Sequence, residues 1–175
     1  AKAAFTEELE IMRRDLDVLN PLDEAGVIAN LAATLLQMHD QEANAEHLRE
    51  AETLLREALA GARDGLSEES SRLAIAPIRS LLGLCLTRQG RASEGVVFLQ
   101  EALDTFVQSE RGSTANGLMT RLNLVRALHA DGRRAEARSE LAVATKLADE
   151  SGNQAIVDKL SAVETDLWGA GSGTK

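Results

Sequence analysis

A recurring pattern of residues restricts what this chain can fold into more than any other feature of its sequence. The run that contains Leu82-Gly83, Gly90 and Leu99 returns 42 residues later, and its second half also occurs 44 residues earlier. The three copies of that second half are Ala51/Leu55/Ala58, Gly95/Leu99/Ala102 and Ala137/Leu141/Ala144. A fixed period in this range is typical of helical hairpins that stack on one another. Such stacks provide surfaces for partners more often than they form active sites.

The composition favours helices along the whole chain. Of 175 residues, 44% are hydrophobic, and most of these are Ala and Leu, whereas Pro occurs only twice. Ala and Leu are strong helix formers, and no stretch shows the period-two, β-branched pattern of a strand. We therefore predict an all-α fold in a single domain over residues 1–168, followed by a flexible tail at 169–175.

The charge pattern argues against nucleic acid and membranes as partners. The net charge is −9, and Lys and Arg are interspersed among acidic residues rather than clustered. A phosphate backbone or an anionic lipid surface requires clustered cations. The sequence shows neither a signal peptide nor an apolar run of about 20 residues. The single Cys85 forms no disulfide within the chain, which fits the reducing cytoplasm, the location we expect.

Apolar spacing and turn residues divide the chain into hairpins with a helix at each end. Pro77 predicts a kink near residues 73–77, or a short helix followed by the main one. Ser67 is expected to cap the helix that contains Pro77. The predicted units are a flanking helix at 4–19 with an apolar stripe (Phe5, Leu9, Met12, Leu16 and Leu19), repeats at 22–62, 67–109 and 114–150, and a capping helix at 154–168.

These motifs resemble the tetratricopeptide repeat family over roughly residues 22–150. In that family, helix A carries a Leu-Gly pair and a large residue, a turn Gly follows, and helix B carries Ala, a large residue and Ala. The second repeat supplies these as Leu82-Gly83, Leu86, Gly90, Gly95, Leu99 and Ala102; the third as Leu124-Val125, Leu128, Gly132, Ala137, Leu141 and Ala144; the first as Leu31-Ala32, Leu35, Ala51, Leu55 and Ala58. The resemblance implies a right-handed α-solenoid of three antiparallel hairpins plus flanking helices at both ends.

Several departures from the family pattern carry information. Gly95 stands where Ala is usual, at a cost of about 1 kcal/mol in helix propensity, and Val125 replaces a small residue. The first hairpin has seven extra residues between Ala32 and Ala51, and we expect them to lengthen both arms by about one turn. Periods of 42 and 44 resemble the long repeats of kinesin light chains and of bacterial signalling and regulatory proteins.

The resemblance implies that the A helices line a concave groove that holds a partner peptide. Asn30 and Asn123 occupy the same repeat position, and an amide pairs with both the donor and the acceptor of an extended backbone. The guanidinium group of arginine can donate two parallel hydrogen bonds to a carboxylate. Arg88 and Arg126 therefore suggest that the partner peptide carries an acidic motif. Alternatively, the Asn side chains are merely solvated and the Arg side chains pair with local acids. The candidate groove residues are Asn30, Gln37, Ser80, Thr87, Arg88, Asn123, Arg126 and His129.

Nothing in the sequence points to catalysis, to a metal or to a cofactor. The three histidines, His39, His47 and His129, match no metal-ligand spacing, and no nucleophile motif accompanies His129 and Asp131. Cys85 is expected to be a buried packing residue. Trp168 either seals the end of the stack or marks a contact with another chain.

The sequence therefore predicts a non-catalytic protein–protein interaction module that binds a peptide or a partner helix in its groove. An alternative is a self-association or autoregulatory module of a larger signalling or transcription-regulatory protein of bacterial type. In that case a homodimer would form through the end helices, since large exposed apolar stripes mark interfaces.

Overall fold

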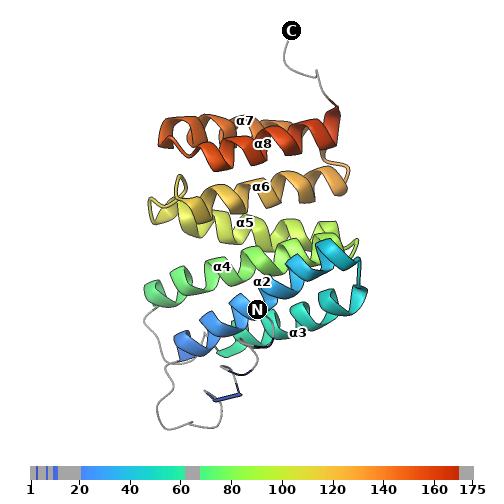
Figure 1. The fold of residues 1–175 in the computed structure, drawn as a ribbon. Helices are drawn as coiled ribbons and strands as arrows, with labels where there is room; N and C mark the ends of the chain where they lie inside the picture. The colour runs from blue at the N-terminus through green and yellow to red at the C-terminus, as the bar shows by residue number, and fades with distance from the viewer. Residues whose placement is uncertain (1–2, 4–6, 8–9, 12–20, 62–67, 170–175) are drawn as a thin grey trace.

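The computed structural model describes residues 3, 7, 10–11, 21–61 and 68–169 of the chain (Figure 1). Apart from isolated helical residues near the N-terminus, these residues form seven helices and no strand, which confirms the all-α prediction for this part of the chain. The helices are α2 (Pro21–Glu42), α3 (Ala45–Gly61), α4 (Glu68–Arg88), α5 (Ala92–Gln108), α6 (Ala115–Ala130), α7 (Arg134–Ser151) and α8 (Gln154–Trp168).

The helices pair in chain order and the pairs lie one above another (Figure 1). Helix α2 packs on α3, α4 on α5, and α6 on α7, because the short connections make sequence neighbours antiparallel. We call α2, α4 and α6 the A helices, and α3, α5 and α7 the B helices. Each A helix also contacts the next, and α6 contacts α8, whereas no B helix contacts another among the described residues. The A helices therefore form a continuous layer on one side.

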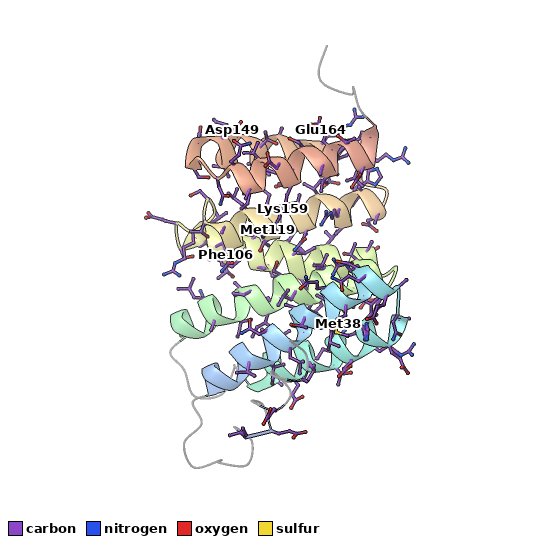
Figure 2. All side chains as sticks on the ribbon, in the orientation of Figure 1. Met38, Phe106, Met119, Asp149, Lys159 and Glu164 are labelled. Carbon is purple, nitrogen blue, oxygen red and sulfur yellow. The ribbon has the colours of Figure 1, made fainter. Side chains whose placement is uncertain are left out.

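The apolar core is divided into two large clusters. The first joins α2, α3 and α4 around Leu35, Leu55 and Leu82, and the second joins α5 to α8 around Leu99 and Leu128. Figure 2 shows the side chains along the whole stack, with Met119 on α6 and Lys159 on α8 among those labelled. The two clusters meet where α4 crosses α5.

At that crossing the two backbones are in direct contact through a pair of glycines. A Cβ atom built on Gly83 would lie 2.8 Å from the carbonyl oxygen of Gly95, and one on Gly95 would lie 2.6 Å from the carbonyl oxygen of Gly83. Real Cβ atoms do not approach a backbone oxygen so closely, so both positions require glycine. This geometry explains why Gly95 replaces the usual Ala despite its low helix propensity.

Four helix ends share one closing geometry. Gly90, Gly132 and Gly152 have φ values of 81°, 81° and 67°, the left-handed region that glycine adopts without a steric penalty. At each, the following N–H donates to a carbonyl in the last turn of the helix, as in Arg91 to Leu86 (2.9 Å). Glu110, with φ 57°, occupies the same place after α5 although it carries a side chain.

The first hairpin is taller than the second at its turn end. Helix α2 continues past Leu31 at least one turn further than α4 continues past Leu82, and α3 begins about one turn further ahead of Ala51 than α5 begins ahead of Gly95. Only Ala43 and Asn44 separate the two helices. The extra residues therefore lengthen both arms, as their number predicts.

Pro77 does not divide its helix. Helix α4 is assigned without interruption from Glu68 to Arg88, so the alternative of a short helix followed by a main one is wrong. Pro77 is only partly buried, and it lies on the side of α4 that is turned away from α5. The carbonyl group that its ring leaves without an N–H partner is therefore not sealed inside the α4–α5 contact.

Three predictions fall outside the described residues. These are most of the flanking helix at 4–19 with its apolar stripe, the cap at Ser67, and the flexible tail from residue 170 onward. Of the 4–19 segment, Glu7, Glu10 and Ile11 are described; they are helical, and Ile11 is 46% exposed.

Replacing Gly95 with Ala should destabilise the fold although Ala is the better helix former. The added Cβ would push α4 and α5 apart, at a cost of about 1–3 kcal/mol after the gain in propensity. Urea unfolding of Gly95→Ala measures this change. Gly26→Ala on α2 is the matched control, since a Cβ there meets nothing within 4 Å. The control should be neutral or more stable, and equal effects of both changes would contradict the close-contact interpretation.

Replacing Glu110 with Gly should stabilise the protein by about 0.5–1 kcal/mol. The left-handed conformation costs a side-chain-bearing residue about 1–2 kcal/mol, which exceeds the entropic cost of glycine. Thermal melting of Glu110→Gly checks the direction. Gln100→Gly, inside α5 and exposed, should instead lose about 1 kcal/mol. A lower melting temperature for Glu110→Gly would show that the Glu110 conformation carries no strain.

Candidate functional site

The layer of A helices presents one stripe of residues from each helix, turned away from the B helices. On α4 this stripe lies opposite Gly83, the residue that touches α5. We call these three stripes together the open face. Its members are Gly26, Asn30, Ala33 and Gln37 on α2, Pro77, Leu81, Leu84 and Arg88 on α4, and Met119, Asn123, Arg126 and Ala130 on α6. All except Asn123 are partly or fully exposed, so the face is accessible and mixes apolar with polar groups.

The amide side chains of the open face differ in their surroundings. Asn30 and Gln37 are exposed on α2. Asn123 on α6 is only 6% exposed, and its Oδ1 has no hydrogen-bond partner among the described residues. A buried polar atom without a partner costs about 1–3 kcal/mol, so such atoms are rare in folded proteins. The Asn123 carbonyl is therefore an acceptor in need of a donor.

Two arginines, Arg88 and Arg126, lie near each other on the open face, and among the described residues only Arg88 has a carboxylate partner. Arg88 forms an ion pair with Asp40 of α2 at 2.5 Å, which ties the end of α4 to the first hairpin. Burial lowers the pKa of Arg88, Asp40 raises it in part, and nearby Arg126 lowers it again through repulsion. Arg126 itself forms no ion pair or hydrogen bond with any residue that the structure describes. The cationic charge at this place is only partly compensated.

Two of the candidate groove residues use their hydroxyl groups inside the fold. Ser80 is 7% exposed and accepts a hydrogen bond of 2.9 Å from Thr120, which joins α4 to α6. Thr87 donates to the carbonyl of Gly83 at 2.8 Å, and its Oγ1 lies against Gly95. Both residues thus support the packing of helices, and their role toward a partner stays a prediction.

His129, at the C-terminal end of α6, faces the last helix of the stack. Its ring meets that of Trp168 edge to face at 5.3 Å between centroids, and the guanidinium of Arg138 lies 5.5 Å from the same indole ring. Trp168 therefore packs against α6 and α7, which agrees with the interpretation that it seals the end of the stack. His129 belongs to this aromatic contact rather than to the centre of the open face.

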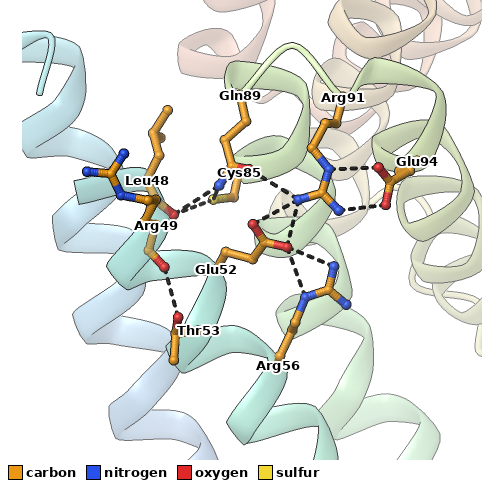
Figure 3. A network of polar contacts seen from close by, with 9 residues as sticks. All are labelled: Leu48, Arg49, Glu52, Thr53, Arg56, Cys85, Gln89, Arg91 and Glu94. Carbon is orange, nitrogen blue, oxygen red and sulfur yellow. Dashed lines mark hydrogen bonds and ion pairs between the residues drawn. The ribbon is translucent and has the colours of Figure 1, made fainter. Parts of the chain in front are cut away.

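A network of ion pairs between the first two hairpins was not expected from the sequence (Figure 3). Glu52 on α3 accepts hydrogen bonds from Arg56 at 2.8 Å and from Arg91 at 2.8 Å, and Arg91 also forms a two-pronged pair with Glu94. Arg91 stands in the α4–α5 turn, so Glu52 links α3 to that turn. Burial by itself would raise the pKa of Glu52, but the hydrogen bonds from Arg56 and Arg91 outweigh it and lower the pKa below 4.5.

Part of this network could have been predicted from the sequence, because it recurs with the repeat period. The pair of Arg91 and Glu94 returns 42 residues later as Arg133 and Glu136, which form the same two-pronged contact at 2.6 and 2.8 Å. Hydrogen bonding from Arg133 lowers the pKa of Glu136, as hydrogen bonding from Arg91 lowers that of Glu94. Each pair spans the first turn of a B helix, so the motif fixes where that helix begins.

Two further arginines of the A helices are joined to the B helix of their own hairpin. Arg79 on α4 pairs with Glu101 on α5 at 3.1 Å, and the equivalent Arg121 on α6 pairs with Glu140 on α7. Arg121 is only 8% exposed, and its Nε has no partner among the described residues. These pairs lie between helices and are not available to a partner.

The remaining cysteine and histidine side chains make contacts within the fold. The Cys85 thiol is buried and donates to the Leu48 carbonyl at 3.2 Å, and burial raises its pKa to about 11, as expected for a packing residue. His39 contacts the Asn44 carbonyl in the first turn. Within the described ranges, no three His, Cys, Asp or Glu side chains converge in a way that would hold a metal ion. No described helix has the length and apolarity of a membrane span.

No protein-family model matches this chain, and no curated protein matches its sequence. The likeness to tetratricopeptide repeats therefore rests on the motifs in the sequence and on the arrangement of the helices.

Replacing Glu52 with Gln should lower the free energy of unfolding more than replacing Glu94 with Gln. Glu52 bonds Arg56 on its own helix and Arg91 across a hairpin boundary, whereas Glu94 bonds one neighbour. Because the pKa of Glu52 is lower in the folded than in the unfolded state, its contribution is complete above about pH 4.5 and is lost as the pH falls through the folded value. Urea unfolding at several pH values measures this. A gap between wild type and Glu52→Gln that stays constant on acidification would contradict it.

Proposed function

We propose that this chain is a non-catalytic, tetratricopeptide-like module that binds an extended segment of a partner protein on its open face. The arrangement of helices supports the comparison with this family. Among the described residues the A helices contact one another whereas the B helices do not, glycines meet at the α4–α5 crossing, and the second and third hairpins close with left-handed glycines. A stack in which one layer of helices is continuous curves into a solenoid with that layer on the inner side.

The observation that carries this proposal is the unpartnered amide oxygen of Asn123. It lies in the middle of the open face, one turn before Arg126, and only a small part of the side chain reaches the surface. The oxygen is enclosed in this conformation, and a backbone N–H of an extended peptide would be the matching donor once the Asn123 side chain rotates outward. Asn30, at the matching position of α2, is exposed and offers a second amide.

The charge of the open face favours an acidic segment. Arg88 and Arg126 repel each other, and Asp40 neutralises only one of them. A carboxylate placed beside Arg126 would form a charge-assisted pair without displacing an existing one. Leu81, Leu84 and Met119 lie along the same face and provide apolar contacts on either side of the charged group. The proposed partner segment is thus extended, with an acidic residue near apolar ones.

Selection from a library of random peptides against the immobilised protein tests this function. We expect acidic peptides to be enriched, and the double variant Asn123→Ala/Arg126→Ala to bind them at least about tenfold more weakly, since a hydrogen bond to a charged group contributes about 1.5–3 kcal/mol. Circular dichroism and thermal melting accompany each affinity measurement.

The control removes the same two kinds of group from the B helices. Gln100→Ala/Arg49→Ala alters exposed residues of α5 and α3, and it should leave the affinity unchanged. Arg126→Gln alone serves as a second test, because Arg126 makes no contact whose loss would unfold the protein. Selected peptides that bind the wild type, Asn123→Ala/Arg126→Ala and Arg126→Gln equally well would exclude the open face as the binding site.

A further inference from the structure

A second recess lies at the end of the stack, apart from the open face. It is a cleft of about 630 Å³ where the end of α6, the start of α7 and the end of α8 meet. We call it the end cleft. Its lining residues are His129, Arg134, Ala135, Arg138, Leu167 and Trp168. The protein has a net charge of −9, yet the described lining of this cleft includes two arginines and no carboxylate.

Comparison with the preceding hairpin shows that these arginines are a departure from the repeat. Arg134 and Arg138 occupy the positions that Ala92 and Val96 occupy on α5. Ala92 and Val96 are 8% and 1% exposed and are part of the packing of α5, whereas Arg134 and Arg138 are exposed. Two positions that are apolar and buried in the second hairpin are therefore cationic and exposed in the third.

Neither arginine has an acidic partner within the described part of the chain, and the contact that Arg138 makes there is with the ring of Trp168. Arg134 and Arg138 form no ion pair there, and the acidic residue of the first turn, Glu136, is already held by Arg133. Two cations in the first turns of a helix oppose its dipole, and like charges four residues apart repel each other. Both effects destabilise α7. The presence of Arg134 and Arg138 is understandable if a bound anion offsets both effects.

Trp168 supplies a rigid wall to the cleft. The Arg138 guanidinium lies 5.5 Å from its ring centroid, which fixes the charged group beside the cleft, and His129 meets its edge. The indole N–H is buried and has no acceptor among the described residues. Leu167 and Ala135 add apolar surface beside these donors.

We propose that the end cleft binds an acidic side chain of a partner protein, with Arg134 and Arg138 holding the carboxylate and with Leu167 and Trp168 contacting an adjacent apolar residue. This inference rests on the proposed function, since it assigns a second contact to the same acidic partner. A protein segment fits better than a membrane or nucleic acid, because the cationic surface is confined to two arginines. The arginines, the apolar wall and the open cleft together match a carboxylate next to an apolar group.

The single tryptophan makes the cleft directly observable. The chain contains one Trp and no Tyr, so its tryptophan emission reports on the end cleft alone. The probe is an acetylated, amidated hexapeptide of alternating Glu and Leu, and the reference peptide has Gln in place of Glu. We expect a saturable change in emission with the Glu peptide that weakens as salt is added, and none with the Gln peptide. The double variant Arg134→Gln/Arg138→Gln should weaken binding roughly 10- to 100-fold.

Matched controls separate this inference from the open-face proposal. Arg49→Gln/Arg111→Gln removes the same charge elsewhere, and Asn123→Ala/Arg126→Ala alters only the open face; both should keep the emission change. Equal binding of the Glu and Gln peptides, no loss in Arg134→Gln/Arg138→Gln, or equally tight binding of N-acetylglutamate would overturn the end cleft as a peptide site. Loss only in Asn123→Ala/Arg126→Ala would overturn it as well while supporting the open face.

Discussion

The direct contact between the backbones of α4 and α5 is the constraint on which the rest of the structure depends. Gly83 and Gly95 leave no room for a side chain between them, so the two helices cross at one fixed place. One apolar cluster lies on the side of α2 and α3, and the other on the side of α6 to α8. A close-packed interior transmits a shift at such a contact to both clusters. The orientation of α4 that follows also decides which of its residues reach the open face.

The polar contacts add connections that apolar packing alone does not specify. Arg91 both closes the first turn of α5 and reaches back to Glu52, so the start of the second hairpin is joined to α3. Arg88 reaches Asp40, and Thr120 reaches Ser80. Each of these pairs joins two hairpins. Exposed ion pairs contribute little to stability singly, but pairs that bridge hairpins restrict how one unit is set on the next.

The sequence predicted the features that depend on nearby residues. Helix positions, the left-handed turns at Gly90 and Gly132 and the longer arms of the first hairpin follow from local spacing and from the repeat. The contacts of Ser80, Thr87 and Arg88 were not predicted, because their partners lie on other helices or on the hidden side of their own. From the sequence alone, Gly95 only lowers the helix propensity of α5. The reason for a glycine there is the contact with Gly83, which lies on another helix. A kink near residues 73–77, or a short helix followed by the main one, was predicted from Pro77, and α4 instead runs as one helix through it.

The positions that follow the period and those that depart from it have different roles. Leu82, Leu99 and their counterparts Leu124 and Leu141 are buried in both hairpins, because stacking requires the same packing each time. Where the third hairpin departs from the second, Leu81 and Leu84 become Asn123 and Arg126.

The same contrast applies to α7, where Arg134 and Arg138 replace Ala92 and Val96. One of these four departures leaves a buried amide oxygen without a donor, and three leave arginines without an ion pair among the described residues, although Arg138 lies over the ring of Trp168. Residues that are not matched by partners within the fold are the basis on which we propose binding there. The third hairpin is therefore where we place recognition, and the second is where the stack is fixed.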